Sequence, residues 1–429
     1  MIKKEYNFDV AVIGAGPAGM IAAGRAAELG SKVILVEKNK KAGRKLLLTG
    51  KGRCNITNAE FNLKKLVENY GESGKFLFHA FSAFGPKRVI DFFEKLGLKT
   101  KTERGKRVFP LSDKSEDVLG TLIKYLIKNK VNIIYNSEIV GIDYQGREIR
   151  KLILKNREIV AKNYIFCTGG KSYPLTGSTG NGFKWANNLG HHVKELYPAL
   201  VPIKIKESWV KELQGLSLEN VEINVFQKDK KRYSVFGECL FTHFGLSGPI
   251  ILGISKKIGE LLRNEEIKSV EDGIKQFNTV KISLDLKPAL DSEKLDKRIQ
   301  RDFRKYQNKS FKNCLNDLLP RKLIPVIVKL SNIAPEKRVN NVTKEERCNL
   351  VKLLKNLEMT TNGLLGFDSA IITSGGISLK EIDDKTMRSK IIDNLFFAGE
   401  IIDIDGPTGG FNLQVCWSTG CLAGENAVK

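Results

Sequence analysis

The N-terminal part of the chain contains the pattern that most restricts how it can fold. Residues 9–13 form an apolar run, residues 14–19 read Gly-Ala-Gly-Pro-Ala-Gly, and an alanine-rich stretch follows over residues 20–29. A second apolar run, residues 32–36, ends at Glu37. A strand, a glycine turn, a helix and a second strand thus follow one another directly, which is the context that makes G-x-G-x-x-G informative. The pattern predicts a βαβ unit that binds a dinucleotide.

Each glycine of this turn has a separate expected role. Gly14 permits the tight turn, Gly16 lets the backbone approach a pyrophosphate, and Gly19 lets the helix pack closely on the sheet. The free N–H groups and the dipole of the helix N-terminus stabilise phosphate charge. The carboxylate of Glu37 can accept hydrogen bonds from ribose hydroxyls. The fingerprint alone does not distinguish FAD from NAD.

Two longer segments decide between these cofactors. Residues 43–58 read Gly-Arg-Lys-Leu-Leu-Leu-Thr-Gly-Lys-Gly-Arg-Cys-Asn-Ile-Thr-Asn, and residues 396–414 read Phe-Phe-Ala-Gly-Glu-Ile-Ile-Asp-Ile-Asp-Gly-Pro-Thr-Gly-Gly-Phe-Asn-Leu-Gln. Together they resemble a family of bacterial FAD-dependent oxidoreductases that includes aminoacetone oxidase-like enzymes, bile-acid double-bond reductases and a ribosomal-RNA dihydrouridine synthase. Shorter blocks in the same order extend the resemblance over nearly the whole chain: residues 107–110, 167–170, 177–182, 241–249 and 373–376. The resemblance implies FAD, which we expect to bind non-covalently because no His or Cys stands in an obvious attachment motif.

The loop over residues 43–58 has the chemistry that an anionic cofactor needs. It offers backbone N–H groups at its glycines, cations at Arg44, Lys45 and Arg53, and the amide of Asn55. An ordinary solvated basic loop is the alternative. Near the C-terminus, a buried strand runs into Gly399, and residues 409–410 precede a helical stretch. The resemblance implies that Glu400 and Asp403 lie on the ribityl or phosphate side, and that the backbone of residues 410–413 faces the flavin pyrimidine edge.

The residues that we expect to contact FAD therefore come from both ends of the chain. They are Gly14, Gly16, Pro17, Ala18, Gly19, Glu37, Lys38, Arg44, Lys45, Leu46, Gly52, Arg53, Asn55, Thr168, Gly169, Gly399, Glu400, Asp403, Gly410, Phe411, Asn412 and Leu413.

The middle of the chain has a different pattern. Alternating runs at residues 200–205, 221–226 and 280–286 indicate antiparallel strands. We therefore expect an α/β protein whose FAD-binding, Rossmann-like domain, of the two-dinucleotide-binding-domain type, is built from both chain ends. Its expected parts are residues 1–196 and 390–429, with an inserted antiparallel β domain over residues 197–290 and 356–389 and a small helical subdomain over residues 291–355. No second G-x-G-x-x-G occurs, so NAD(P)H is expected to bind only transiently as the reductant.

The chain is strongly basic, with 71 Lys and Arg against 48 Asp and Glu and a net charge of +23. Such an excess favours polyanions as partners, although a lysine-rich proteome would have the same effect. A helical period over residues 292–319 places Arg298, Arg301, Lys305, Lys309 and Lys312 on one face. This stripe, with Phe311 and the basic segment 99–107, is the candidate RNA-binding surface, and an ordinary solvated face is the alternative.

Two residues are candidates for proton donation, Cys54 and His243. A cation next to Cys54 would lower its pKa, and the alternative is a small packed residue. His243 precedes a Gly-Leu-Ser-Gly-Pro turn, where capping or packing is an equal alternative. His191 and His192 are expected at the surface. Four scattered histidines and seven scattered cysteines predict no metal site and reduced thiols.

The expected activity is NAD(P)H-dependent reduction of a carbon–carbon double bond, with a uridine of 23S ribosomal RNA as the best candidate substrate. One alternative is a small-molecule enzyme, either an amine oxidase or a steroid or bile-acid double-bond reductase. Another is a flavin-bound RNA-binding factor without catalysis. No stretch of ~18 apolar residues is present, so no membrane span is expected. Residues 1–8 form a short polar segment, and glycines interrupt the apolar stretch that follows, which is unlike a secretory signal; a cytoplasmic protein is therefore expected.

Overall fold

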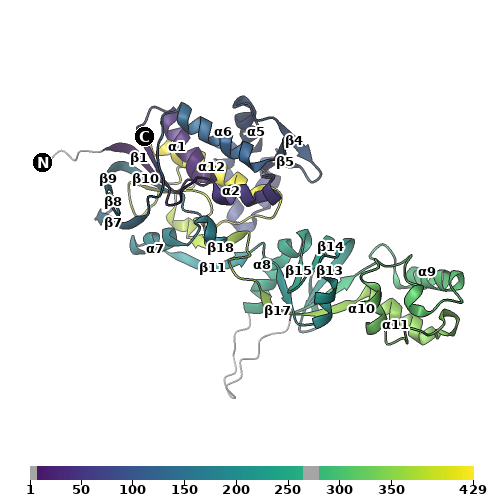
Figure 1. The fold of residues 1–429 in the computed structure, drawn as a ribbon. Coiled ribbons are helices and arrows are strands. Elements are labelled where there is room, and N and C mark those ends of the chain that lie inside the picture. Colours follow the sequence, from purple (N-terminus) through teal and green to yellow (C-terminus); the bar gives the residue numbers. More distant parts are fainter. Residues whose placement is uncertain (1–6, 264–279) are drawn as a thin grey trace, which may run out of the picture. The chain divides into compact units, whose positions relative to one another are not determined.

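The computed structural model describes residues 7–263 and 280–429, and the chain divides into two compact units (Figure 1). The first consists of residues up to Pro198 and of Phe367–Lys429, and the second is Ala199–Gly366. Residues 367–389, which the sequence analysis assigns to the inserted domain, thus belong to the first unit. The reason is that β18 (Ile372–Ile377) pairs with β11 (Val193–Ala199). The expected helical subdomain is grouped with the β-rich insertion in the second unit.

A five-stranded parallel sheet forms the centre of the first unit. Its order is β19 (Leu395–Phe397), β10 (Ala161–Phe166), β1 (Phe8–Ile13), β2 (Val33–Val36) and β6 (Asn132–Ile134). The pairs β10–β19, β1–β10, β1–β2 and β2–β6 are all parallel. The two ends of the chain therefore share one sheet, as the sequence predicts.

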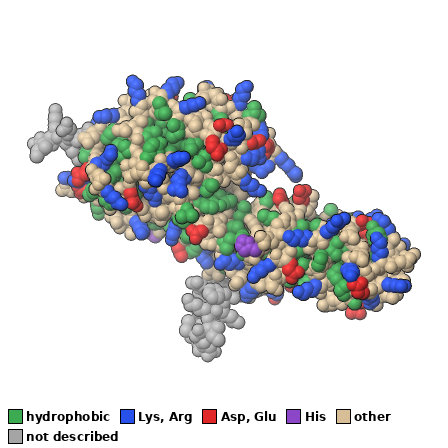
Figure 2. Space-filling view, viewed as in Figure 1, with side chains coloured by type: hydrophobic (Ala, Val, Ile, Leu, Met, Phe, Trp, Pro, Cys, Tyr) green, Lys and Arg blue, Asp and Glu red, His purple; other side chains and the backbone are tan. Residues whose placement is uncertain are grey.

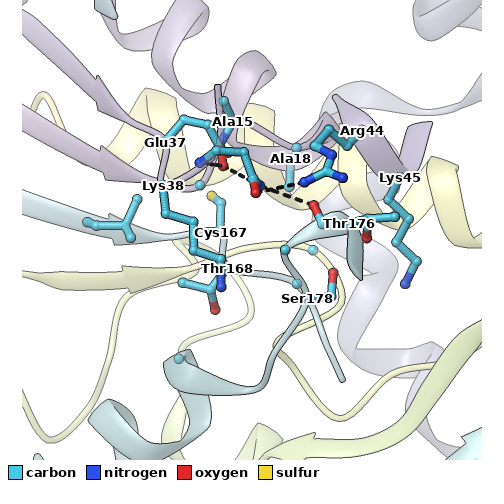
Figure 3. A pocket seen from close by; sticks show the side chains of 18 of the residues that line it. Ala15, Ala18, Glu37, Lys38, Arg44, Lys45, Cys167, Thr168, Thr176 and Ser178 are labelled. Carbon is cyan, nitrogen blue, oxygen red and sulfur yellow. Dashed lines mark hydrogen bonds between the residues drawn. The ribbon is translucent and has the colours of Figure 1, made fainter. Parts of the chain in front are cut away.

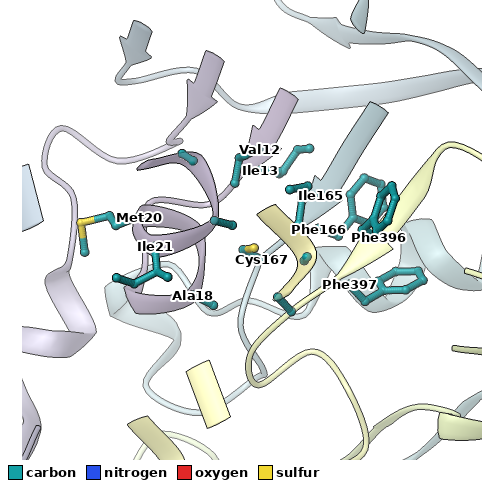
Figure 4. Packing of buried hydrophobic residues seen from close by; sticks show 14 of the residues in the cluster. Val12, Ile13, Ala18, Met20, Ile21, Ile165, Phe166, Cys167, Phe396 and Phe397 are labelled. Atoms are coloured by element: carbon teal, nitrogen blue, oxygen red, sulfur yellow. The ribbon is translucent and has the colours of Figure 1, made fainter. Parts of the chain in front are cut away.

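Helix α1 (Pro17–Glu28) and helix α12 (Phe411–Asn426) pack directly against each other (Figure 1). A Cβ atom added at Gly420 would lie 2.5 Å from the carbonyl oxygen of Ala18, and one at Gly424 would lie 2.5 Å from that of Ala22. The two backbones thus touch where α12 has glycine. Figure 4 shows Ala18, Cys167, Phe166 and Phe397 as members of one buried hydrophobic cluster.

The remaining elements of the first unit surround this core. The helices and short helical turns are α2 (Arg44–Leu48), η1 (Thr49–Gly52), α3 (Leu63–Glu68), η2 (Gly71–Leu77), α4 (Phe78–Phe84), α5 (Pro86–Lys95), α6 (Ser115–Lys128), η3 (Pro174–Thr176), α7 (Asn181–Asn188) and η7 (Leu379–Glu381). The strands β3 (Thr57–Asn58), β5 (Arg107–Pro110) and β4 (Thr100–Glu103) form one antiparallel sheet, and β7 (Ile139–Gln145), β8 (Glu148–Leu154) and β9 (Glu158–Ile159) form another.

A closed antiparallel barrel forms the centre of the second unit. Its order is β12 (Ile203–Ile205), β15 (Gly245–Ser247), β14 (Lys230–Thr242), β13 (Ser217–Gln227), β16 (Val280–Asp285) and β17 (Leu357–Leu364). The three alternating runs of the sequence overlap β12, β13 and β16. Helix α8 (Pro249–Arg263) packs against the barrel, where the buried amide of Gln227 donates to the carbonyl oxygen of Leu261 at 2.9 Å.

The other helical elements of this unit are η4 (Ser208–Leu213), α9 (Ser292–Lys305), η5 (Phe311–Asn313), α10 (Ile324–Leu330), η6 (Val339–Asn341) and α11 (Lys344–Lys355). Helix α9 begins at a cap, where the Asp291 carboxylate accepts from the N–H of Lys294 at 2.7 Å. It ends at Lys305, so the helix predicted over residues 292–319 is too long. The chain turns there because Ser310 forms an isolated bridge with Arg338. Among the helices of the described residues, none is long and apolar enough to cross a membrane.

Candidate functional site

A pocket opens in the first unit where β1, β2, β10 and β19 end (Figure 3). Its open space is about 970 Å³, including the part that faces solvent. Segments far apart in the sequence line it: the turn after β1, the start of α2, the loops after β10 and β19, and residues 176–182. A ligand at the carboxyl ends of parallel strands is the usual arrangement in open α/β sheets.

The three glycines of the first turn differ in what surrounds them. Gly14 has φ +99°, and an added Cβ would lie 2.6 Å from the carbonyl oxygen of Cys167. A Cβ at Gly19 would lie 1.9 Å from the carbonyl oxygen of Gly14. A Cβ at Gly16 would meet no atom of the described structure within 4 Å. Packing therefore explains Gly14 and Gly19, whereas the glycine at position 16 keeps open the space where a ligand would approach.

The N-terminus of α1 faces this space. Gly16 caps the helix, Pro17 occupies its first turn, and no side chain of the described residues accepts from its free N–H groups. Lys38, Arg44 and Lys45 also line the pocket. Burial lowers the pKa of the Lys38 ammonium. A helix N-terminus with neighbouring cations binds phosphate well, so this end of the pocket fits the pyrophosphate of FAD.

The Glu37 carboxylate is buried and held in one orientation beside this end. One oxygen accepts from the N–H of Ala15 at 2.9 Å, and the other accepts from the N–H and side-chain amide of Asn39 at 2.8 and 2.7 Å. Each oxygen has more than one acceptor site. The carboxylate can therefore accept a ribose hydroxyl while it keeps these contacts.

Residues 176–179 close one side of the pocket, as Figure 3 shows for Thr176 and Ser178. The Lys38 ammonium donates to the hydroxyl of Thr179 at 2.7 Å, and the Asn39 amide donates to the carbonyl oxygen of Thr176 at 3.1 Å. The sequence analysis did not place this segment in the site. The family block at residues 177–182 overlaps this segment and was the available sequence signal. The glycine spacing of that block fits no phosphate-binding loop, so the block was not assigned to the site.

Lys45 and Glu400 form an ion pair in the same pocket. The ammonium lies 2.8 Å from a Glu400 oxygen and donates to the Ser172 hydroxyl at 2.6 Å. The Glu400 carboxylate also accepts from the N–H of Thr373 at 2.9 Å. Only 21% of the Lys45 side chain and 16% of the Glu400 side chain are exposed. The network joins four separate segments at the pocket wall.

Two buried polar atoms have no hydrogen-bond partner among the described residues, the Thr168 hydroxyl oxygen and the side-chain oxygen of Asn55. Such atoms are rare and call for an explanation. Thr168 lines the pocket, so a hydrogen-bonding ligand there would satisfy it. Together with the open face of Gly16, this unpartnered hydroxyl shows that the pocket fits a dinucleotide cofactor.

The structure brings together thirteen of the expected cofactor residues around this pocket. They are Gly14, Gly16, Pro17, Ala18, Glu37, Lys38, Arg44, Lys45, Leu46, Thr168, Gly169, Gly399 and Glu400. Nine others do not line it: Gly19, Gly52, Arg53, Asn55, Asp403, Gly410, Phe411, Asn412 and Leu413. Lining residues that the sequence analysis missed include Asn39, Lys41, Ser137, Glu138, Thr176, Ser178, Thr179, Asn181, Trp185 and Cys416.

Two of these nine side chains, Arg53 and Asp403, are held by ion pairs within the protein. The Arg53 guanidinium donates to Asp113 at 2.8 Å, also pairs with Glu103, and lies over the Phe109 ring at 4.1 Å. Asp403 pairs with Lys194 at 2.6 Å.

The start of α12 is packed against β3. A Cβ at Gly410 would lie 2.3 Å from the carbonyl carbon of Thr57, and the Asn412 side chain accepts from the N–H of Gly406 at 2.8 Å. The side chain of Gln414 accepts from the Thr57 hydroxyl. Gly410 and Gln414 thus pack the start of α12 against the end of the loop of residues 43–58.

The candidate proton donors have different surroundings from those expected. Cys54 is fully buried, and burial raises the pKa of its thiol to about 12. The lowered pKa predicted from a nearby cation is therefore wrong, because Arg53 points to Asp113 and Glu103 instead. His243 lies in the second unit, exposed in the turn between β14 and β15, with its ring edge-on to Phe244 at 4.8 Å.

His191, expected at the surface, is buried. Its ring lies 3.2 Å from Glu381 and 2.9 Å from the Ser389 hydroxyl, and burial lowers its pKa. His192 is exposed, as expected. Within residues 7–263 and 280–429, no group of three or more His, Cys, Asp or Glu side chains is arranged to hold a metal ion.

The candidate RNA-binding stripe is not continuous. Lys309 and Lys312 lie beyond the end of α9. Arg298 pairs with Asp302 at 2.8 Å, Lys305 with Asp317 at 2.7 Å, and Lys312 with Glu336. Phe311, expected to support RNA contact, is fully buried.

The parallel sheet, the glycine turn and the pocket define a dinucleotide-binding protein of the Rossmann type. Known proteins support this class. The family described as HI0933-like protein Rossmann domain matches residues 8–426. The chain belongs to this family of FAD-dependent oxidoreductases.

Two relatives are similar over nearly their whole length. The 3-dehydro-bile acid delta(4,6)-reductase of Clostridium scindens is 29% identical over 98% of this chain and 99% of its own. The ribosomal RNA dihydrouridine synthase of Escherichia coli is 28% identical over 98% of both chains. Among solved structures, the 3-ketosteroid-delta4-(5alpha)-dehydrogenase of Rhodococcus jostii has a TM-score of 0.54 at 15% identity and covers 100% of this chain and 98% of its own. This last likeness concerns the fold alone.

Proposed function

We propose that the protein catalyses the NAD(P)H-dependent reduction of a carbon–carbon double bond in a uridine of large-subunit ribosomal RNA, in the cytoplasm. NAD(P)H loses a hydride and becomes NAD(P)⁺. The double bond gains this hydride and one proton from solvent or an acidic group, and a single bond between the two carbons remains. When bound, FAD carries the hydride between the two reactants.

The observation that carries the RNA substrate is the charge of the chain. The 71 Lys and Arg against 48 Asp and Glu favour a polyanion, whereas a steroid substrate does not need such an excess. The full-length likeness to a ribosomal RNA dihydrouridine synthase supports the same substrate class. On the face in Figure 2, Lys and Arg are dispersed over both units.

The residues of the pocket have binding and orienting roles in this proposal. The free N–H groups of α1, with Arg44 close by, would hold the pyrophosphate, and Glu37 would hold a ribose. The Lys45 ammonium lies between the Ser172 hydroxyl and the Glu400 carboxylate. This network would fix the ribityl side of the cofactor, and it keeps the protons of the Lys45 Nζ directed at acceptors.

Mapping of dihydrouridine in ribosomal RNA tests this function. In a strain that lacks the gene, uridine should replace dihydrouridine in the large-subunit RNA. A wild-type copy should restore dihydrouridine, and a Gly16→Val copy should not, because its side chain fills the space where the cofactor backbone approaches. An unchanged dihydrouridine pattern in the deletion strain would refute the RNA substrate.

The electron donor is tested separately with the purified flavoprotein. NADH or NADPH, added without oxygen, should bleach the flavin absorbance, and the preferred nucleotide should do so faster. Absence of bleaching with both would exclude NAD(P)H as the reductant.

A steroid is the second candidate substrate, since the Clostridium scindens relative is named as a bile-acid reductase. Reoxidation of the reduced flavin by a conjugated 3-oxo steroid, but not by large-subunit ribosomal RNA, would favour this candidate. The reverse result would favour the uridine.

A further inference from the structure

Residues 291–355, which contain α9, α10 and α11, form a strongly basic part of the chain. They hold 17 Lys and Arg against 8 Asp and Glu, whereas all other residues hold 54 against 40. An excess of 9 charges thus lies in 65 residues, compared with 14 in the other 364. This helical part of the second unit therefore carries more net charge per residue than the remaining residues taken together.

The acidic side chains of this part are almost all used by ion pairs. In the described structure, seven of the eight pair with a basic neighbour: Asp291 with Lys294, Glu293 with Lys297, Asp296 with Arg347, Asp302 with Arg298, Asp317 with Lys305, Glu336 with Lys312 and Glu346 with Lys337. These ion pairs neutralise most of the expected stripe. The excess positive charge of residues 291–355 therefore lies on other cations.

Three uncompensated cations lie in the last turn of α9, just after α9 and just before η6. Arg304, Lys309 and Arg338 are exposed, and none of them forms an ion pair with a described residue. Ser310 forms a bridge with Arg338, and the N–H of Val339 donates to the carbonyl oxygen of Lys309 at 3.0 Å. The segment that follows α9 therefore lies beside the segment that precedes η6, and both carry unpaired cations.

The Tyr306 ring holds one of these cations in position. The Lys309 ammonium lies 4.5 Å from the ring centre. The Tyr306 hydroxyl donates to Asp317 at 2.7 Å, which fixes the ring. A cation held over an aromatic ring loses less freedom when it binds an anion. Tyr306 is thus a positioning residue for Lys309.

We propose that Arg304, Lys309 and Arg338 form a contact site for RNA phosphates, with Tyr306 positioning Lys309. The inference rests on the proposed RNA substrate and adds where the second unit holds that RNA. It replaces the stripe, because Arg298, Lys305 and Lys312 already have acidic partners. Release of counterions by these cations favours a polyanion.

The surroundings of the site favour RNA over an anionic membrane. Exposed amides at Asn308, Asn340 and Asn341 can bond bases and 2′-hydroxyls. Membrane-surface helices bury apolar side chains, and no large hydrophobic side chain is exposed within residues 291–355.

The test measures binding of the full-length FAD-bound protein to transcribed large-subunit ribosomal RNA. Lys309→Gln with Arg338→Gln should weaken binding about tenfold near physiological salt and lower the salt slope by about 0.7 to 0.9 for each phosphate that is no longer neutralised. The matched control is Lys329→Gln with Lys352→Gln, which removes two exposed, unpaired cations from α10 and α11. It should change affinity less than about twofold.

A second pair of variants tests the positioning residue. Tyr306→Phe keeps the ring and should retain most of the affinity, whereas Tyr306→Ala should reduce it about fivefold. Equal losses in the site and control variants would overturn the local site in favour of a diffuse charge effect. If Lys309→Gln with Arg338→Gln loses binding to phosphatidylserine vesicles but keeps its RNA binding, the RNA contact site is also overturned.

The failure of this site can be distinguished from the failure of the proposed function. If the wild-type protein forms dihydrouridine but the Lys309 and Arg338 variant binds RNA normally, only the site is wrong. If the wild type neither binds the RNA nor forms dihydrouridine, both are wrong. In every variant, flavin content and bleaching by NAD(P)H should stay unchanged.

Discussion

The junction of α1 with α12 and the outer face of α9 are stabilised by contacts of opposite kinds. At the junction, Gly420 and Gly424 bring one backbone against another, with no space for a side chain. On α9, the ion pair between Arg298 and Asp302 spans 2.8 Å, with 33% of the arginine side chain and 8% of the aspartate side chain exposed. One region is closed to solvent, and the other reaches solvent through its arginine.

The difference determines how much a substitution should cost in each region. Protein interiors are close-packed, so a single added carbon at the junction must displace backbone. On the α9 face, water and salt screen the charges, and ion pairs of this kind contribute about 0–1 kcal/mol. Residue identity is therefore strongly constrained at the junction and weakly constrained on α9.

The largest expected effect is that of Gly420→Ala. The new Cβ would lie 2.5 Å from the carbonyl oxygen of Ala18, so the free energy of unfolding should fall by about 2–3 kcal/mol. Urea denaturation monitored by circular dichroism measures it. The control is Gly120→Ala in α6, where an added Cβ meets no atom of the described residues within 4 Å. This control should stabilise the protein by about 0.5–1 kcal/mol. Equal effects of the two variants would contradict the close backbone packing of α1 on α12.

The next effect concerns Gly16, at the end of α1 where close packing stops. Gly16→Val should leave the stability of the apo-protein unchanged, because the space around this position is open in the described structure. Its affinity for FAD should fall about a hundredfold, or ~2.7 kcal/mol. Titration of apo-protein with FAD measures the affinity, and thermal melts without FAD are the control. A variant that keeps wild-type affinity would show that the pyrophosphate lies elsewhere.

The same distinction separates what the sequence could predict from what it could not. Gly14, Gly19 and Glu37 act through short-range backbone geometry, so their spacing predicts the turn, the sheet and the acid beside it. The thirteen lining residues also lie next to such local signals, while the choice of FAD depends on the family resemblance. Asp317 and Glu336, which neutralise the stripe, reach it only through tertiary folding.

Burial is the other property that the local pattern did not contain. Cys54 follows Arg53 in the sequence, yet the guanidinium turns away and the thiol is enclosed. His191 looks like a helix-end residue, yet Glu381 and Ser389, about 200 residues later in the chain, cover it. Both errors arise because a neighbour in sequence was taken for a neighbour in space.

A smaller effect is expected from pH at Cys54. Its thiol keeps its proton in the native state up to a pKa of about 12, whereas the ordinary value is 9.0. Above pH 9 the unfolded chain therefore releases a proton that the native chain holds, and stability falls as pH rises, by about 1.4 kcal/mol at pH 10. Cys54→Ala removes this contribution.

Urea denaturation from pH 7 to pH 10 measures the effect. The difference in unfolding free energy between the wild type and Cys54→Ala should shrink by about 1.4 kcal/mol between pH 7 and pH 10. Cys348→Ala, at a half-exposed thiol, is the control and should run parallel to the wild type. Parallel curves for Cys54→Ala as well would show that the thiol is accessible to water.

The smallest effect is expected on α9. In a double-mutant cycle with Arg298→Met and Asp302→Asn, the coupling energy should be about 0.5 kcal/mol. The arginine precedes the aspartate by four residues, which is the weaker orientation relative to the helix dipole. Urea denaturation of the four proteins measures the coupling, and added NaCl should reduce it, because the partly exposed arginine is screened. A coupling above about 2 kcal/mol, insensitive to salt, would mean that Asp302 is held as firmly as the glycine junction. The contrast between the closed junction of α1 with α12 and the more open face of α9 would then not hold for this ion pair.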